Sequence, residues 1–383
     1  MQQFYTAESV VRGHPDKLCD QIADAILDDC LRHDRYARVA CEVLATQGHI
    51  VIAGEITCTH SPNVEPIARA VLNEIGYEED RFQITCLLHS QSGDIAQGVS
   101  NSLESRRGHP TMGLGAGDQG IVVGYACEET WQYLPLPVVL ARRLTRQLDQ
   151  VRLSGEVPFL GPDGKAQVTV EYDELGRPSR IATVVLSAQH SEGVPQDELT
   201  FALTDKVITP ALSVLPPDEN TILLLNPAGR FVVGGPDGDT GLTGRKLSVD
   251  TYGVFAPHGG GSFSGKDPTK VDRSGAYMAR YIAKNLVAAH LCKRCQVTLA
   301  YAIGREQPVS VEVDTFGTGR YCSDDCLTRA VELLFGLTPG EMIQELDLLT
   351  PWYFRTAAYG SFGHRDFPWE RTDKVRELRG ALL

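Results

Sequence analysis

One pattern recurs three times along the chain and limits the folds that it can adopt. Residues 38–57, 167–187 and 296–315 each read as an apolar strand, a short polar turn and a second strand. The first residues of these segments are 129 positions apart in both steps. An equal spacing of one pattern indicates a repeated structural unit.

Helical patterns flank each of the three predicted hairpins. In the first of them, Leu18, Ile22, Ile26 and Cys30 recur every four residues and form an apolar stripe. The predicted helices cover residues 16–33, 137–153 and 273–291 before the hairpins, and 64–75, 196–215 and 324–335 after them. Three helix–hairpin–helix units in 383 residues predict an α+β fold of three related domains.

Charge and composition exclude several classes of protein. The net charge of −13 argues against a general nucleic-acid-binding protein. The N-terminus lacks the apolar segment of a secretory signal, and no apolar run reaches the length of a membrane span. Ten cysteines without such a signal are typical of reduced thiols. We therefore expect a cytoplasmic protein that binds neither nucleic acid nor membrane.

Residues 229–273 combine glycines with charges of both signs and form the strongest candidate site. Glycine lets backbone N–H groups approach a ligand closely, and lysine and arginine add positive charge. Carboxylates among these cations favour a polyphosphate bound together with Mg²⁺. The alternative is a long surface loop with ordinary turns. It is disfavoured because two glycine blocks carry the same mixture of charges on either side of a predicted strand, 247–255.

Within this segment, residues 260–266 match the phosphate-binding pattern G-x-x-x-x-G-K. A P-loop next requires Ser or Thr for Mg²⁺, but Asp267 and Pro268 follow here. Pro268 also argues against a helix that begins directly behind Lys266. We interpret the segment as a phosphate site that is not a Walker A motif.

The first predicted unit carries three further candidates. Pro15 suits a first helical position, so the sequence predicts His14 on an exposed elbow at a helix N-terminus and Asp16 in the first turn. Glu42 and Glu55 share their strand faces with apolar residues, where a carboxylate needs a partner or a cation. The alternatives are a helix-dipole role for Asp16 and an exposed edge strand for the glutamates.

Two other segments leave more than one interpretation open. Residues 91–120 form a long polar stretch that predicts a lid over a site, or alternatively a mobile interdomain linker. Four cysteines have spacings that a zinc site could use, but four unlinked thiols are the favoured interpretation. These cysteines are Cys292, Cys295, Cys322 and Cys326.

Five motifs in one order resemble the S-adenosylmethionine synthetase (methionine adenosyltransferase) family over residues 4–374. They are GHPDK at 13–17, GEIT at 54–57, GAGDQG at 115–120, GGPDGDTGLTGRK at 234–246 and HGGGSFSGKDPTKVDRS at 258–274. The resemblance implies three similar α+β domains about a pseudo-threefold axis. The expected segments are 2–99, a flexible active-site loop at 100–120, 113–231 and 232–371.

The family reaction implied by the resemblance joins ATP and L-methionine. The methionine sulfur attacks C5′ of ATP, and the released triphosphate is cleaved to phosphate and diphosphate. The residues that match catalytic positions are His14, Lys165, Arg245, Lys266 and Lys270. Those that match ATP-binding positions are His14, Asp163, Lys165, Arg230, Phe231, Asp239, Arg245, Lys246, Ser262 and Lys266.

The resemblance also implies a methionine site, metals and partners. The methionine positions match Glu55, Gln91, Asp118, Asp239 and Lys270. Asp16 and Asp272 match ligands of Mg²⁺, two ions per site, and Glu42 matches the ligand of K⁺. A homodimer or homotetramer with active sites between subunits is implied.

Three departures from the family pattern are visible, and two rival functions remain. Cys292, Cys322 and Cys326 match no family role. Ser262 stands where the family more usually has alanine, and the 100–114 loop is unlike those of common members. Arg106 and Arg107 in that loop either reach phosphate or solvate the loop. The rivals are another phosphoryl-transfer enzyme, which would release ADP, and a non-catalytic member that binds ATP without turnover.

Overall fold

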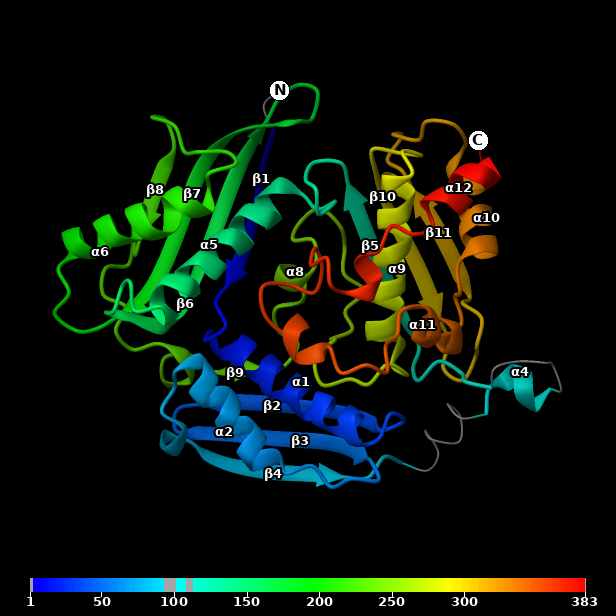
Figure 1. Cartoon of the computed structure of the whole chain (residues 1–383), viewed down its shortest axis with the longest axis horizontal. Coiled ribbons are helices and arrows are strands. Elements are labelled where there is room, and N and C mark those ends of the chain that lie inside the picture. The colour runs from blue at the N-terminus through cyan, green and yellow to red at the C-terminus, as the bar shows by residue number, and fades with distance from the viewer. Residues whose placement is uncertain (1–2, 93–100, 108–112, 383) are drawn as a thin grey trace.

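Three β-sheets, each with a long helix on one face, form the described part of a computed structural model, residues 3–92, 101–107 and 113–382 (Figure 1). The first sheet has the order β4 (Gln83–His89), β3 (His49–Thr57), β2 (Arg38–Thr46) and β9 (Gly241–Leu242). The second has the order β1 (Gln3–Val10), β6 (Leu160–Tyr172), β7 (Pro178–His190) and β8 (Ile222–Leu225). The third has the order β11 (Ser310–Asp314), β10 (Arg294–Tyr301) and β5 (Gly120–Cys127).

The long helices α1 (Pro15–His33), α5 (Leu136–Leu153) and α9 (Val271–Ala288) lie on the inner sides of the sheets, toward the middle of the molecule (Figure 1). Each confirms a helix that the sequence predicts. The other α-helices are α2 (Val64–Ile75), α4 (Leu103–Arg106), α6 (Gln196–Ala202), α7 (Thr209–Ala211), α8 (Leu247–Asp250), α10 (Asp324–Leu334), α11 (Pro339–Glu345) and α12 (Val375–Leu382). A π-helical turn, Leu203–Ile208, joins α6 to α7, and 3₁₀ turns cover Glu79–Arg81, Gly235–Asp237, Tyr353–Thr356 and Pro368–Glu370.

All three predicted hairpins are antiparallel pairs. The β2–β3 pair aligns Arg38 with Thr57, and the β10–β11 pair aligns Gln296 with Asp314. The β6–β7 pair contains the hairpin predicted over 167–187, and its register shifts at several points. The predicted α+β fold of three repeated units is therefore confirmed.

The sheets nevertheless exchange strands between units. The N-terminal strand β1 pairs with β6, β5 pairs with β10, and β9 pairs with β2. Each exchange carries the chain from one unit into its neighbour. The first glycine-rich segment (234–246), the second (258–274) and the start of α1 thereby come together, although they are far apart in sequence.

Buried side chains form two cores. The larger core is continuous through the first and third units, and the smaller lies between α5 and the second sheet. Tyr353, Phe362, Phe367 and Trp369 of the C-terminal segment belong to the larger core. Trp369, for example, is fully buried and stacks on Tyr277 with ring centroids 4.0 Å apart.

One predicted strand is wrong. Residues 247–255 do not form a strand, because Leu247–Asp250 is the short helix α8 and turns follow it. The Arg142 side chain of α5 donates hydrogen bonds to the carbonyls of Val249, Asp250 and Thr251. Because these carbonyls accept hydrogen bonds from the guanidinium, they do not need the backbone N–H groups of a neighbouring strand.

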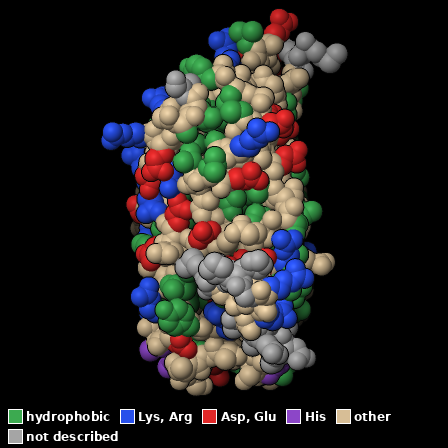
Figure 2. Space-filling model, turned by 90° about the vertical axis from the view of Figure 1, so that its right-hand side faces the viewer, with side chains coloured by type: hydrophobic (Ala, Val, Ile, Leu, Met, Phe, Trp, Pro, Cys, Tyr) green, Lys and Arg blue, Asp and Glu red, His purple; other side chains and the backbone are tan. Residues whose placement is uncertain are grey.

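The surface that carries α10, α11 and α12 mixes charges of both signs with apolar side chains (Figure 2). Lysine and arginine do not gather into one basic patch on this face (Figure 2). No helix among the described residues combines the length and apolar character that crossing a membrane requires.

Candidate active site

A row of four aspartates on α1 holds the glycine-rich segments and a turn of the C-terminal segment in place. Asp16, Asp20, Asp24 and Asp28 are spaced by four residues, so their side chains follow one side of the helix. Each is at most 2% exposed. Their carboxylates accept backbone N–H groups of Leu242, Gly244, Gly265 and Tyr353 at 2.8–3.0 Å, in that order.

The row explains how the sequence positions the site. A buried carboxylate is costly unless its oxygens receive hydrogen bonds. For Asp16, Asp20 and Asp24 the donors are N–H groups of the segments that carry Lys246 and Lys266. Asp28 instead accepts from the C-terminal turn that begins at Tyr353. The sequence analysis overlooked this role for Asp20, Asp24 and Asp28, although their regular spacing beside the apolar stripe was a visible signal.

His14 begins α1 but is buried, so the prediction of an exposed elbow is wrong. Its Nδ1 accepts the N–H of Asp16 at 3.2 Å, which makes it the N-cap of the helix. The neighbouring Gly13 carbonyl accepts the Tyr77 hydroxyl, which covers the elbow. Burial, then Lys246 and Lys165, lower the pKa of His14 to about 4. The ring is therefore neutral at pH 7, and Nε2 carries its proton.

Asp16 is bound by the first glycine-rich segment. Its Oδ2 lies 2.5 Å from Nζ of Lys246, and its Oδ1 lies 3.7 Å from a guanidinium nitrogen of Arg245. Burial acts against the charge of Asp16, but the hydrogen bonds from Lys246 and Leu242 hold the pKa of this carboxyl below its usual range. A charged aspartate and two cations thus meet at the N-terminus of α1.

The second glycine-rich segment supplies an equivalent pair. Nζ of Lys266 lies 2.6 Å from Oδ2 of Asp272 in the first turn of α9. Gly265 has φ of +78°, and a Cβ there would lie 1.9 Å from the Cys41 carbonyl oxygen. Only glycine fits this approach to β2. As the motif analysis predicts, no helix begins directly after Lys266, since α9 begins at Val271.

The two glycine-rich segments touch each other. A Cβ on Gly244 of the first would lie 2.5 Å from Cβ of Ser262 in the second. A Cβ on Gly261 would lie 2.2 Å from the carboxylate of Asp272. The structure therefore brings Ser262, Lys266 and Asp272 beside the segment that ends in Arg245 and Lys246.

The second sheet delivers Asp163 and Lys165 to the same place. Lys165 is paired with Val10, the last residue of β1 before the chain reaches His14. Asp163 accepts the N–H of Gly235 at 2.8 Å, and burial raises the pKa of Asp163 to about 6. Asp239 follows in the same turn, where its N–H donates to the Gly235 carbonyl at 3.0 Å.

Glu42 lies on the face of the first sheet opposite α1, and its side chain is exposed. The surrounding sheet desolvates its carboxylate and raises the pKa of Glu42, against the opposing effect of nearby Lys266. The edge-strand interpretation is wrong, because β2 lies between β3 and β9. Glu55 shares this face and lies 3.4 Å from Nε2 of His89.

The remaining predicted residues lie around this group. Arg230 is exposed and paired with Glu192 at 2.7 Å. Phe231 donates its N–H to Nε2 of His190 at 3.2 Å. The Gln189 side chain connects this strand end to Asp163, since its Oε1 accepts the N–H of Asp163 at 3.0 Å.

The predicted methionine positions lie in three places. Gln91 donates its N–H to the Thr57 hydroxyl at 3.0 Å, just beyond the end of β4. Gly117, next to Asp118, approaches the start of α9, where a Cβ would lie 3.8 Å from Cα of Lys270. The side chain of Lys270 forms an ion pair with buried Asp267.

The predicted lid is only partly described, because residues 93–100 and 108–112 lie outside the described residues. Within the described residues of this stretch, α4 packs on the turn that follows β10. Leu103 donates its N–H to the Gly304 carbonyl at 2.8 Å, and the Ser102 hydroxyl donates to Glu306 at 2.5 Å. Arg106 and Arg107 are both exposed.

The four cysteines considered for zinc are free thiols, and two of them, Cys292 and Cys295, are buried. They do not converge as a metal-binding group in the described part of the chain.

Comparisons with known proteins agree with this arrangement. Models of the N-terminal, central and C-terminal domains of S-adenosylmethionine synthetase match residues 2–94, 113–231 and 233–371. A protein of Desulforudis audaxviator (strain MP104C) named S-adenosylmethionine synthase is 51% identical over 99% of this chain and 98% of its own length. A Nocardioides sp. (strain ATCC BAA-499 / JS614) protein of that name has the same identity and coverage. The chain therefore belongs to the S-adenosylmethionine synthetase family of enzymes.

Proposed function

We propose that the chain joins ATP and L-methionine by attack of the methionine sulfur on C5′ of ATP. In a second step it cleaves the released triphosphate to phosphate and diphosphate. The observation that supports this proposal is a group of four cationic side chains. Three of them surround the neutral His14 and Asp16 at the N-terminus of α1, and the fourth is paired with Asp272 in the adjoining glycine-rich segment. The four cations are Lys165, Arg245, Lys246 and Lys266.

The chemistry explains why cations, rather than a base, dominate the site. A thioether sulfur is a neutral nucleophile, so the first step requires no proton removal. The barrier lies in separating charge and in stabilising an anionic leaving group, which fixed donors and cations do best. His14 contributes the Nε2–H donor, while the lysines contribute point charges and Arg245 a planar pair of donors.

The carboxylates fit Mg²⁺. Asp16 and Asp272 offer hard oxygen ligands, and each is now paired with a lysine that could instead bind phosphate. Two Mg²⁺ ions held by these residues would neutralise charge on the triphosphate and orient it. The N–H of Leu242 holds Oδ1 of Asp16 in place, and Oδ2 becomes free for the ion when Lys246 turns to phosphate.

Glu42 is the proposed K⁺ ligand. Its carboxylate stands on the open face of β2, within the electrostatic reach of Lys266. A monovalent cation there would favour the charged form of Glu42. It would also fix the position of the strand that pairs with Lys266 through Ala40.

The adenosine part of ATP and the methionine are assigned to residues that lie around the proposed phosphate-binding group. Phe231 would stack on adenine, with Arg230 and Asp163 near the nucleotide. Glu55 and Asp118 would hold the methionine ammonium, since both carboxylates lie at the surface of this region. Gln91, Asp239 and Lys270 would complete the methionine site.

A second copy of the chain is proposed to close the site. The face of the first sheet that carries Glu42 and Glu55 also carries Leu87, which is 60% exposed. Ile121 of β5 and Ile222 of β8 are 55% and 56% exposed. Exposed apolar side chains on open sheet faces are typical of surfaces that pair in oligomers. We propose a homodimer built on these faces, or a homotetramer of two such dimers.

The test is an analysis of products. The chain is incubated with ATP, methionine, Mg²⁺ and K⁺, and the products are identified by mass spectrometry. The proposal predicts S-adenosylmethionine, phosphate and diphosphate in equal amounts. Formation of ADP with a phosphorylated product would favour the phosphoryl-transfer rival, and ATP binding without any product would favour the non-catalytic one.

A further inference from the structure

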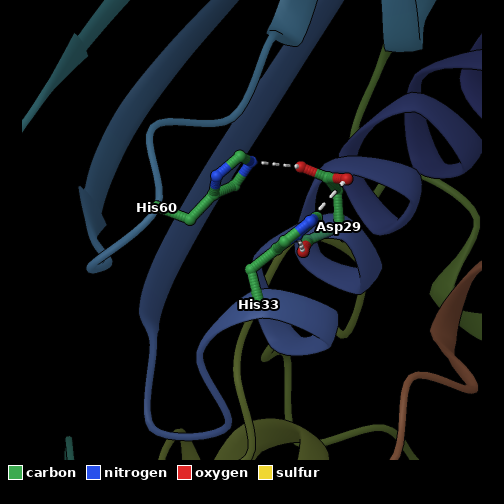
Figure 3. A group of neighbouring side chains, drawn as sticks. All are labelled: Asp29, His33 and His60. Atoms are coloured by element: carbon green, nitrogen blue, oxygen red, sulfur yellow. Dashed lines mark hydrogen bonds and ion pairs between the residues drawn. The ribbon is translucent and has the colours of Figure 1, made fainter.

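Three side chains with metal-binding groups converge at the C-terminal end of α1, away from the candidate active site (Figure 3). Asp29 and His33 are four residues apart on α1, so they share one face of the helix. His60 comes from the segment between β3 and α2. One ligand atom from each of the three side chains lies within 4.8 Å of the other two.

One nitrogen of the His33 ring is available to a metal ion. Nδ1 of His33 lies 2.9 Å from the carbonyl oxygen of Asp29, so Nδ1–H donates to this carbonyl and Nε2 keeps its lone pair. A ligating histidine commonly donates its other N–H to a carbonyl in this way. Nε2 of His60 lies 3.4 Å from Oδ2 of Asp29. The two imidazole rings are stacked, with centroids 3.9 Å apart, so one ring has to turn about its side-chain bonds before both can bind the same ion.

The segment that carries His60 is fastened to the same end of α1. Thr59 donates its N–H to Oδ2 of Asp34 at 2.9 Å, and Asp34 is the C-cap of α1. The thiol of Cys58 points to the Cys30 carbonyl at 3.8 Å, and its sulfur accepts the N–H of His60 at 3.4 Å. These contacts hold the backbone around His60 in place independently of any ligand, so only side chains would turn when an ion binds.

We propose that Asp29, His33 and His60 bind one divalent transition-metal ion of the Zn²⁺ class, with water completing the coordination. Two imidazoles and one carboxylate are the ligand set of open zinc sites, whereas Mg²⁺ and Ca²⁺ prefer oxygen ligands alone. The side chains of Asp29, His33 and His60 are 20%, 49% and 37% exposed, which leaves room for water and for exchange with solvent.

The ion would join the end of α1 to the connection that leaves β3. It would lie roughly 20 Å along the helix from Asp16, because 13 residues separate Asp16 from Asp29 at 1.5 Å per residue. Its expected effect is on the stability of the first unit, since an ion that binds only the folded chain stabilises it. Adenosyl transfer is expected to be independent of it.

The test measures Zn²⁺ binding by calorimetry on the full chain, after treatment with a chelator and in saturating Mg²⁺. The variants are His60→Ala and Asp29→Asn. The matched control is His290→Ala, because His290 is 55% exposed and paired with a single carboxylate, Glu128. We expect the parent and the control to bind one Zn²⁺ with the same affinity. Both site variants should bind it at least about tenfold more weakly, because even substitutions of residues that only support the ligands commonly lower metal affinity 10–100-fold.

Co²⁺ serves as a second probe, because its absorption distinguishes nitrogen and oxygen ligands from thiolates. The proposal predicts a spectrum without thiolate charge-transfer bands, and its loss in His60→Ala. Equal Zn²⁺ binding by the parent and both site variants would overturn the proposal. So would a thiolate spectrum, because it would assign the ion to the cysteines instead. Unchanged adenosyl transfer in folded His60→Ala would support a site separate from the reaction.

Discussion

Replacing Asp24 by asparagine tests how α1 holds the second glycine-rich segment. Asp24 is fully buried and accepts both terminal nitrogens of Arg273, at 2.8 and 2.6 Å. It also accepts the N–H of Gly265, the residue before Lys266. Asn has nearly the same shape and can keep the bond to Gly265, but it removes the charge opposite a guanidinium that is itself 1% exposed.

The expected cost follows from this geometry. A buried ion that loses its partner costs about 3–5 kcal/mol, because its desolvation is no longer compensated. The other groups hydrogen-bonded to Arg273 are neutral, namely the hydroxyls of Tyr277 and Thr356 and the Lys266 carbonyl. Asp28 acts on Arg273 only through space, because its carboxylate accepts from Tyr353 and Phe354, so no group replaces the lost ion pair. Since a folded domain is stable by only about 5–15 kcal/mol, Asp24→Asn is expected to remove a large part of this free energy.

The assay is urea unfolding of the parent and two variants. The control is Glu65→Gln, which breaks the Arg69–Glu65 ion pair on α2. This pair lies one helical turn apart at the surface, with Glu65 51% exposed, and such pairs contribute about 0.3–0.5 kcal/mol. If Asp24→Asn lowered the free energy of unfolding no more than Glu65→Gln does, the reasoning about the buried row would be refuted.

Four further predictions concern the site, pH and assembly. Lys165→Met should slow adenosyl transfer by about 100-fold or more in product assays, as loss of one preorganised charge does, while ATP binding persists; an unchanged rate would remove Lys165 from the site. Glu42→Gln should weaken activation by K⁺ in rate titrations, and an identical K⁺ response in variant and parent would contradict that role. Burial and three neighbouring arginines lower the pKa of His364 from 6.5 to about 4, so the unfolded chain binds this proton more readily. The free energy of unfolding of the parent should therefore fall by at most about 3 kcal/mol as the pH drops from 6.5 to 4. His364→Gln should flatten this part of the pH profile of unfolding, and parallel profiles would exclude it. Leu87→Glu should lower the molar mass measured by light scattering and reduce activity with it, whereas an unchanged mass would exclude the proposed face.

Local sequence patterns predicted the repeated units well. The helix over 64–75 has the predicted bounds, and α1 begins one residue before its prediction. The three hairpins depend on alternation and turns, which act over a few residues. The family motifs added candidate residues, and the structure brings most of the predicted phosphate-binding group together around α1.

Contacts between distant segments explain what the sequence analysis got wrong. The strand predicted over 247–255 is replaced by α8 because Arg142, more than 100 positions earlier, binds its carbonyls. The elbow at His14 is buried because Tyr77 and the strand β9 cover it: a Cβ on Gly241 would lie 2.2 Å from the Pro15 carbonyl carbon. Neither contact leaves a periodic signal near the residues that it changes.

The most direct test of the central claim is a crystal structure of the chain with a non-hydrolysable ATP analogue, methionine and Mg²⁺. The account predicts that the triphosphate lies between His14, Lys165 and the two glycine-rich segments, with Mg²⁺ on Asp16 and Asp272, and that Lys246 and Lys266 have turned from these carboxylates to the phosphates. A triphosphate bound elsewhere, with the ion pairs of Asp16 and Asp272 still intact, would contradict it.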